Sequence, residues 1–344
     1  MKTFACINKN ETIRINSSSG GVFSLLAENV LLSNGIVYGV SMTEDCYSAE
    51  FIRVSNLCEI KKLRGSKYFQ AKIGNSYKRV KQDLIDGKIV LFTGTGCQIN
   101  GLISFLKKDY ANLICVDMIC HGVPSPALWE KYAKFQEKKH GKKIESINFR
   151  CKDESWNDFG IKENNMYISK DKDLFMQLFL NDYCLRPSCY YCVAKKNKKS
   201  DITIADFWGI ENLIPQMNDG KGTSLVIVRT EKGNKLFDQI SSSMIVKNVE
   251  YKEAIKYNPS EYESVKKPME RKQFYKDMNN MKFENLAKKY LKLSLKTKVK
   301  RKLEIFINHI SKKEKTGGHK MKQNSDYGLL FTFNNNQKNE SRQI

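Results

Sequence analysis

Four cysteines stand at spacings that suit a metal ion or an iron–sulfur cluster. Cys189 and Cys192 form a CxxC pair, and two thiolates at this spacing can bind one metal centre from a single turn. Cys97 and Cys120 come from two earlier segments and would complete a set of four. The alternative is that Cys97 and Cys120 are small buried apolar residues, and zinc competes with iron–sulfur as the bound species.

The segments around Cys97 and Cys120 are predicted to form two successive strand–loop–helix units. Residues 88–93 and 113–119 are β-branched and apolar, as in buried strands, and a helical pattern follows each of them. Two such units in succession place their strands parallel, with a right-handed crossover. Both cysteines follow the carboxyl end of a strand, and loops at that edge of a sheet converge. We therefore expect Cys97 and Cys120 to be neighbours in space.

Five of the other six cysteines are assigned by their surroundings, and Cys151 is left without an assignment. Cys184 lies near enough to the CxxC pair to serve as a spare ligand. The start of the chain lacks the charged head and apolar core of a signal peptide, which predicts a cytoplasmic protein with reduced thiols. The cysteines in strand-like or helix-like contexts are expected in the core: Cys6, Cys46, Cys58 and Cys115.

A serine–glycine loop (residues 17–21) precedes a predicted helix over residues 22–32. Its small residues would let backbone N–H groups approach a phosphate, and a helix N-terminus favours anions. This loop is neither a Walker loop nor a GxGxxG fingerprint, so Ser19 as an ordinary helix cap is the competing interpretation. The candidate binding residues in the loop are Ser18, Ser19, Gly20 and Gly21.

A second candidate, the Arg64 loop (residues 64–68), combines two cations, a hydroxyl, a glycine and an aromatic ring. Arg64 and Lys67 could neutralise a pyrophosphate beside Ser66, and the Tyr68 ring could flank an isoalloxazine. The alternative is an exposed basic turn. His121, next to Cys120, could donate a hydrogen bond or a proton, or it could satisfy backbone groups of its own loop.

The chain is strongly basic, with 59 Lys and Arg against 37 Asp and Glu and a formal charge of +22. Such a charge attracts nucleic acid, anionic lipid, phosphorylated cofactors or an acidic protein. A basic zinc-containing nucleic-acid-binding protein is therefore the alternative function, although no recognised nucleic-acid motif stands in the body of the chain. Residues 288–313 could form an amphipathic helix on lipid or on an acidic partner, or a terminal helix packed on the body.

The predicted fold is α/β, with a mixed, largely parallel sheet flanked by helices. An irregular cysteine-bearing part and a flexible basic tail follow it. No run approaches eighteen apolar residues, so no transmembrane helix is expected. The predicted parts are an N-terminal phosphate-binding part, a cysteine-bearing part, a helical basic extension and a disordered tail, over residues 1–87, 88–260, 261–311 and 312–344.

Six runs, in this order along the chain, resemble one family: the beta subunits of coenzyme F(420) hydrogenases and dehydrogenases. The resemblance is to its bacterial relatives that occur with surface-polysaccharide genes. The runs are residues 17–23 (SSSGGVF), 63–68 (LRGSKY), 90–98 (VLFTGTGCQ), 120–125 (CHGVPS), 186–192 (RPSCYYC) and 200–209 (SDITIADFWG).

The resemblance implies an FAD-binding α/β protein with a 4Fe–4S cluster near the flavin. Electrons would pass between cluster, FAD and a second redox carrier or substrate. The cluster ligands would be Cys97, Cys120, Cys189 and Cys192, the two loops would bind FAD, and His121 would be catalytic. A deazaflavin coenzyme is a further candidate cofactor. The expected partners are an electron-donor protein such as a ferredoxin and a small-molecule substrate of a glycan pathway, with peripheral membrane contact through the basic tail.

Overall fold

The computed structural model describes residues 1–291, which lie in one compact unit, Met1–Ser294. The predicted tail over residues 312–344 and the end of the basic extension, residues 292–311, lie outside the described residues. Within the described part of that extension, residues 283–291 are helical, and the buried Leu286 and Tyr290 pack on the hydrophobic core.

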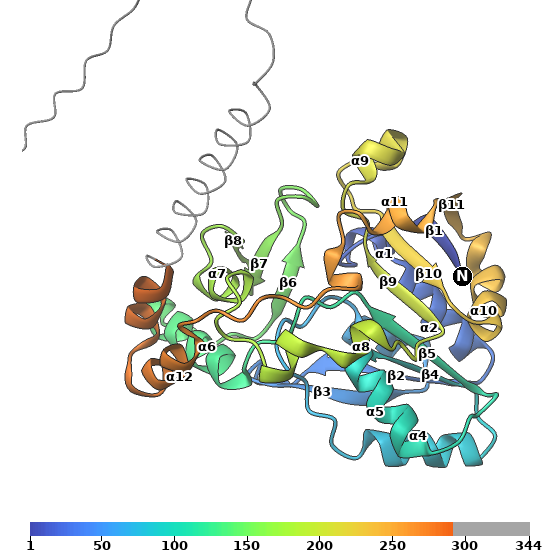
Figure 1. Cartoon of the computed structure of the whole chain (residues 1–344), viewed down its shortest axis with the longest axis horizontal. Coiled ribbons are helices and arrows are strands. Elements are labelled where there is room, and N and C mark those ends of the chain that lie inside the picture. Colours follow the sequence, from blue (N-terminus) through green and yellow to red (C-terminus); the bar gives the residue numbers. More distant parts are fainter. Residues whose placement is uncertain (292–344) are drawn as a thin grey trace, which may run out of the picture. The chain divides into compact units, whose positions relative to one another are not determined.

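An eight-stranded sheet forms the centre of the unit, in the order β11–β1–β10–β9–β5–β4–β2–β3 (Figure 1). The four strands β9, β5, β4 and β2 are parallel, and the other pairs are antiparallel. The α/β fold with a mixed sheet is therefore confirmed, and its parallel part is the centre. The strands are β1 (Lys2–Asn8), β2 (Ile36–Met42), β3 (Ala49–Val54), β4 (Val90–Thr95), β5 (Leu113–Met118), β9 (Ile202–Asp206), β10 (Ser224–Val228) and β11 (Met244–Asn248).

Successive side chains of a strand point to opposite faces of the sheet, so each face has its own hydrophobic core. On one face, α2 (Val22–Leu32) and α10 (Glu231–Ser241) cover Val37, Leu91 and Val116. On the other face, α4 (Ser76–Ile85), α5 (Gly96–Leu106) and α6 (Pro126–His140) contribute to a larger core that includes Phe92 and Cys115. The sheet is thus covered on both sides, as parallel strands require.

A separate three-stranded sheet packs beside α6. It consists of β6 (Ile147–Cys151), β7 (Gly160–Glu163) and β8 (Met166–Ser169), all antiparallel. Trp129 of α6 contacts Phe149 of β6, with ring centroids 4.7 Å apart. Two further helices, α7 (Leu174–Leu180) and α12 (Arg271–Asn280), bury Phe175 and Phe274 in the same core.

Short helices complete the described part of the chain. They are α1 (Glu11–Ile15), η1 (Leu57–Glu59), α3 (Ile60–Leu63), η2 (Pro187–Tyr191), α8 (Val193–Lys196), α9 (Ile210–Leu213), η3 (Pro215–Met217), α11 (Tyr251–Ile255) and η4 (Pro259–Glu261). None of the described helices is long and apolar enough to cross a membrane.

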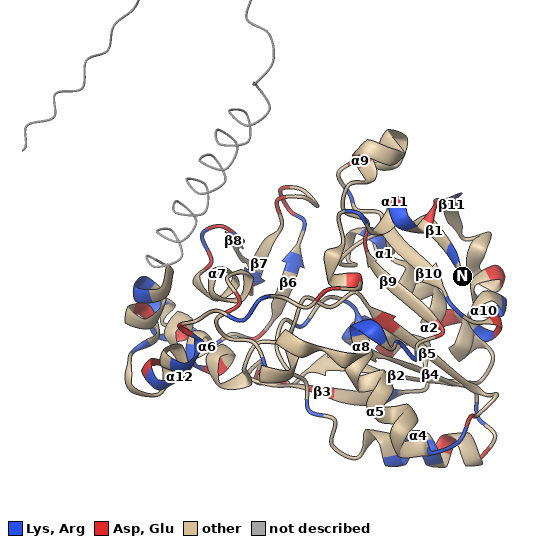
Figure 2. Cartoon of the chain, viewed as in Figure 1, with Lys and Arg blue, Asp and Glu red and all other residues tan. Residues whose placement is uncertain are grey.

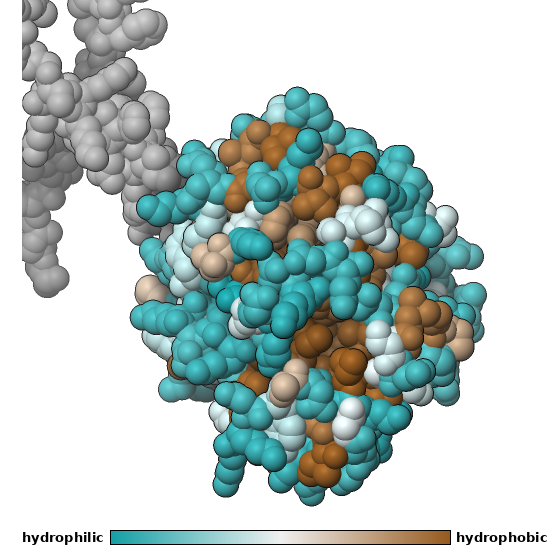
Figure 3. Space-filling view, turned by 90° about the vertical axis from the view of Figure 1, so that its right-hand side faces the viewer, coloured by the Kyte–Doolittle hydropathy of each residue, from teal (hydrophilic) through white to brown (hydrophobic). Residues whose placement is uncertain are grey.

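Basic residues mark α8 at the front of Figure 2. On the side shown in Figure 3, hydrophilic residues predominate and hydrophobic residues gather in a recess below the centre.

Three of the four cysteines expected in the core are buried: Cys6, Cys46 and Cys115. The prediction for Cys58 is wrong. It lies in η1, is exposed, and its thiol donates to Asn56 Oδ1 at 2.8 Å. The helix-like context of Cys58 is a one-turn helix at the surface, which buries none of its residues.

Candidate redox site

The four predicted ligand cysteines line one cavity of about 440 Å³, here called the cysteine cavity. Cys97 comes from α5, Cys120 from the loop after β5, Cys189 from η2, and Cys192 from the residue before α8. The parallel pairing of β4 with β5 explains why two segments that are distant in the chain meet here. Helices α5 and α8 pack together at this edge, as Figure 1 also shows.

Cys97 stands in the first turn of α5, because that helix begins at Gly96. Thr95 caps the helix, and its backbone N–H donates to Gln98 Oε1 at 2.9 Å. The Thr95 hydroxyl lies 3.2 Å from the exposed Cys97 sulfur. The cap therefore fixes both the start of the helix and the direction from which Cys97 enters the cavity.

The other three cysteines are held by backbone contacts. The backbone N–H of Val123 donates to Cys189 Sγ at 3.5 Å, and the N–H of Cys192 donates to Ser264 Oγ at 3.0 Å. Burial raises the pKa of the Cys120 thiol to about 12, and the nearby Cys189 sulfur acts in the same direction. The sulfurs are thus close enough to influence one another.

Four thiols in one cavity could hold a zinc ion or an iron–sulfur cluster. Among residues 1–291, no three His, Cys, Asp or Glu side chains are arranged to hold a single metal ion. A tetrahedral zinc ion, at about 2.3 Å from each sulfur, would bring all four within roughly 3.8 Å of one another. A four-iron cluster carries one thiolate on each iron and accepts a wider ring. Four thiols are the donor set of either group.

Asp117, which the sequence analysis missed, lines the same cavity from β5. Its Oδ1 accepts from Ser200 Oγ at 2.8 Å and from Thr203 Oγ1 at 2.5 Å. Its Oδ2 has no hydrogen-bond partner among the described residues, and Lys198 Nζ is 3.6 Å away. Burial raises the pKa of this carboxyl. A carboxylate inside an otherwise apolar strand was the signal that could have revealed it.

His121 also lines the cysteine cavity. Its Nε2 lies 2.6 Å from Asp182 Oδ1, and its ring meets Phe179 edge-on, with centroids 5.3 Å apart. The partner is a carboxylate and not the loop backbone of the alternative interpretation. The predicted catalytic role of His121 stays a prediction.

Cys184, the spare candidate, lies elsewhere. It is fully buried in the core, and burial raises the pKa of its thiol. It does not line the cysteine cavity, and its carbonyl oxygen accepts a 2.7 Å hydrogen bond from the Tyr275 hydroxyl. This position favours Cys97, Cys120, Cys189 and Cys192 as the set of four.

A second cavity of about 280 Å³, here called the loop cavity, brings the two predicted binding loops together. Both the serine–glycine loop and the Arg64 loop line it. Ser18 and Ser66 join them, because their hydroxyls are 3.0 Å apart and the Ser66 N–H donates to Ser18 Oγ at 3.0 Å. Two loops that are 48 residues apart in sequence thus form one wall.

The serine–glycine loop leaves the N-terminus of α2 without a side-chain cap. Gly21 is the N-cap, with a left-handed φ of 84°, and no side chain accepts from the first N–H groups. The interpretation of Ser19 as an ordinary cap is wrong, because its hydroxyl donates to the Thr223 carbonyl at 2.8 Å. Gly20 does not line the cavity, but its N–H donates to Ser224 Oγ at 2.9 Å. The end of α2 is therefore free to meet an anion.

The Arg64 loop is partly buried rather than an exposed turn. Arg64 Nε donates to Ser24 Oγ at 2.8 Å. Lys67 Nζ donates to the backbone carbonyl of Arg64 at 2.8 Å and to two carbonyls at the end of α3, and burial lowers the pKa of this amine to about 7. The Tyr68 ring packs on Phe179, and burial raises the pKa of its hydroxyl.

The two cavities adjoin each other, because Thr95, Met118 and Val123 line both. Asp206, at the end of β9, is the only carboxylate among the lining residues of the loop cavity. The guanidinium of Arg150, which is buried, lies 2.9 Å from Asp206. The cavity lined by the four cysteines and the cavity lined by the two predicted loops thus share a wall.

Comparison with known proteins identifies the cysteine-bearing half of the chain. Residues 87–254 match a family described as the C-terminal part of the beta subunit of coenzyme F(420) hydrogenase/dehydrogenase. This part of the chain thus belongs to the F(420) hydrogenase/dehydrogenase beta-subunit family. The family supports an oxidoreductase function. No curated protein matches the chain.

A solved structure shares the fold of this chain. It is a xenon derivative of the F(420)-reducing NiFe hydrogenase complex from Methanosarcina barkeri. The match has a TM-score of 0.54 and 14% sequence identity, and covers 76% of this chain and 87% of the other. At this identity the similarity concerns the fold.

Proposed function

We propose that this protein is a flavin- and iron–sulfur-dependent oxidoreductase subunit. It would pass electrons between a 4Fe–4S cluster, FAD and a second carrier or substrate. The observation that carries the proposal is the shared wall: the cavity lined by four cysteines adjoins the cavity lined by both predicted FAD loops. Bound there, a cluster supplies single electrons and a flavin exchanges one or two.

Cys97, Cys120, Cys189 and Cys192 would hold the cluster. Lys195 supports the site from α8, since its Nζ donates to the backbone carbonyl of Cys120 at 2.8 Å. A cation beside four thiolates offsets part of their mutual repulsion. His121, with Nε2 directed at Asp182, would hold or move a proton at the edge of the cavity.

The loop cavity would hold FAD. Its phosphates would meet the uncapped N-terminus of α2, the Ser18 and Ser66 hydroxyls and the Arg64 guanidinium. The Tyr68 ring offers a flat apolar surface to the isoalloxazine. Because Thr95 lines both cavities, the flavin and the cluster would be near neighbours.

An acidic electron carrier such as a ferredoxin would dock beside Cys192. Two exposed apolar side chains flank this cysteine, Tyr191 at 76% and Val193 at 72% exposure. Lys196 and Lys199 are exposed on the same segment. An apolar centre with a basic rim is suited to an acidic partner. A cytoplasmic location, a glycan-pathway substrate and use of a deazaflavin belong to the same proposal.

The cofactor content of the anaerobically purified full chain tests the proposal. We expect roughly four iron atoms, equal sulfide and bound FAD per chain. Cys189→Ser should lose the iron and the sulfide, whereas Cys58→Ser should keep them because Cys58 lies outside the cavity. Stoichiometric zinc without iron or flavin would overturn the proposal.

A further inference from the structure

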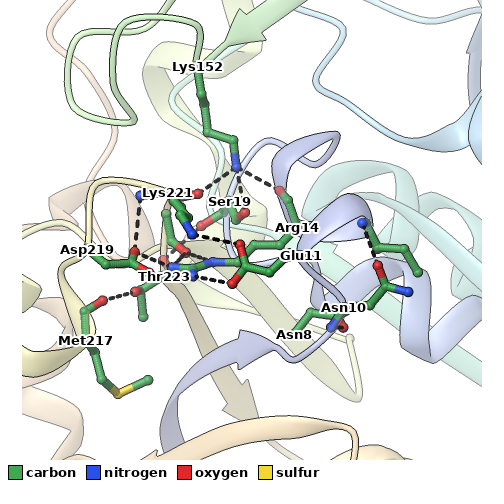
Figure 4. A network of polar contacts seen from close by, with 12 residues as sticks. Asn8, Asn10, Glu11, Arg14, Ser19, Lys152, Met217, Asp219, Lys221 and Thr223 are labelled. Atoms are coloured by element: carbon green, nitrogen blue, oxygen red, sulfur yellow. Dashed lines mark hydrogen bonds and ion pairs between the residues drawn. The ribbon is translucent and has the colours of Figure 1, made fainter.

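The Lys152 ammonium makes an unusual set of contacts. Lys152 directly follows β6, and its Nζ donates to the backbone carbonyls of Arg14 at 2.8 Å, Ser19 at 3.0 Å and Lys221 at 2.8 Å. An ammonium has three N–H groups, so each has a carbonyl partner. Figure 4 shows the three acceptors converging on this one nitrogen from separate segments.

Each acceptor segment is itself anchored. Arg14, which is 1% exposed, pairs with both carboxylate oxygens of Asp219 at 2.6 and 2.7 Å and donates to the Gly222 carbonyl. The Lys221 ammonium binds Glu11 at 2.9 Å (Figure 4). Lys152 therefore joins the small sheet to a rigid frame.

The serine–glycine loop depends on this frame for its conformation. The carbonyl of Ser19 is bound by Lys152, that of Gly20 by the N–H of Asn8 at 2.8 Å, and that of Gly21 by the Asn8 side chain at 3.2 Å. Carbonyl oxygens repel phosphate. With these three oxygens occupied by protein donors, the loop is left to present N–H groups and hydroxyls to an anion.

We propose that Lys152 is a positioning residue that holds the serine–glycine loop in its phosphate-binding conformation. Lys152 does not line the loop cavity, so it acts through the loop and not on the ligand. The inference rests on the proposed function, in which this loop binds the phosphates of FAD. It assigns to the small sheet a task in cofactor binding.

The affinities for FAD, which carries phosphates, and for riboflavin, which has none, distinguish this role from a general effect on stability. In the full chain, Lys152→Met should bind FAD roughly tenfold more weakly, because the loop loses the charge-assisted hydrogen bond on its Ser19 carbonyl and the frame beside it loses two more. Riboflavin, which has no phosphate, should bind with unchanged affinity. Lys152→Arg keeps the charge and should recover part of the FAD affinity.

Lys221→Met is the matched control. It removes a lysine of the same network but leaves the Lys221 carbonyl that Lys152 uses. FAD affinity should stay within twofold of wild type. If wild type binds FAD and Lys152→Met binds it equally well, or loses riboflavin in the same proportion, the positioning role is wrong. If wild type binds no FAD, the proposed function itself fails. Should Lys152→Met not fold, Lys152→Gln tests the same ratio.

Discussion

The hydroxyl of Thr95 lies 3.2 Å from the Cys97 sulfur, and Thr95 also lines the loop cavity. One residue thus touches a proposed cluster ligand and faces the proposed flavin site. This position follows from the start of α5, since the cap of a helix that begins at Gly96 stands between the two cavities. The contact makes Thr95 a sensitive reporter on the cluster.

Thr95→Val should lower the reduction potential of the cluster. The Thr95 hydroxyl donates to Gln98 Oε1 at 3.0 Å in this structure. When Cys97 is a thiolate ligand, the same hydroxyl would instead donate to the sulfur and stabilise the more negative, reduced cluster. Losing a bond of about 1 kcal/mol corresponds to roughly 40 mV for one electron. An anaerobic redox titration measures the shift. Thr95→Ser, which keeps the hydroxyl, is the control, and equal potentials in Thr95→Val and wild type would rule out the bond.

Gly20→Ala should disrupt the serine–glycine loop. An added Cβ would overlap the carbonyl oxygen of Cys6 and lie 2.7 Å from the Ser224 nitrogen, both backbone atoms. We expect a loss of about 2–3 kcal/mol in the free energy of unfolding, together with weaker FAD binding. Gly87→Ala, with a positive φ but open space around it, should cost only about 1 kcal/mol. Denaturant titration measures the free energy of unfolding of both variants. An equal loss at both positions would contradict the packing argument.

Reversing charge beside Cys192 should slow the reaction with an acidic ferredoxin. In Lys196→Glu/Lys199→Glu the association rate at low salt should fall roughly tenfold, and the wild-type rate should decline as salt rises. Stopped-flow kinetics measures both rates. Lys235→Glu/Lys247→Glu changes two exposed lysines on α10 and β11 and serves as control. The docking surface is misplaced if both double variants slow the reaction equally.

Stability should depend on pH through a buried pair of carboxyls. Glu163 and Asp173 both contact the Tyr132 hydroxyl, which has one proton to give, so one carboxyl keeps its own proton. Burial raises the pKa of Asp173 from 3.8 to about 6.

The folded chain therefore holds this proton between pH 4 and 6, where the unfolded chain has released it. The contribution of Asp173 to the free energy of unfolding falls by about 3 kcal/mol as pH rises through that window. The difference in unfolding free energy between wild type and Asp173→Asn should show this fall, and a difference that stays constant from pH 4 to 7 would refute it.

Local patterns in the sequence predicted the parts of the fold that are built from them. Residues 22–32 form the helix α2 with the predicted bounds. The strand–loop–helix pattern correctly predicted the parallel pair β4–β5, and with it the meeting of Cys97 and Cys120.

Long-range contacts escaped the sequence analysis, because no local pattern encodes them. The antiparallel pairing of β1 with β10 joins residues more than 200 positions apart and places the serine–glycine loop beside Ser224. Lys152 and Lys67 bind backbone carbonyls in the structure, but nothing in the sequence distinguishes them from surface lysines. The short strands β7 and β8 have too few residues for a clear alternation.

Electron flow through the cysteine cavity tests the central claim most directly. Full-length wild type, Cys58→Ser and Cys120→Ser, each loaded with FAD, are mixed anaerobically with a reduced ferredoxin, and bleaching of the flavin is followed. We predict fast reduction in wild type and Cys58→Ser, and at least roughly tenfold slower reduction in Cys120→Ser, which lacks a full cluster. Equal flavin reduction in an iron-free Cys120→Ser protein would contradict the account.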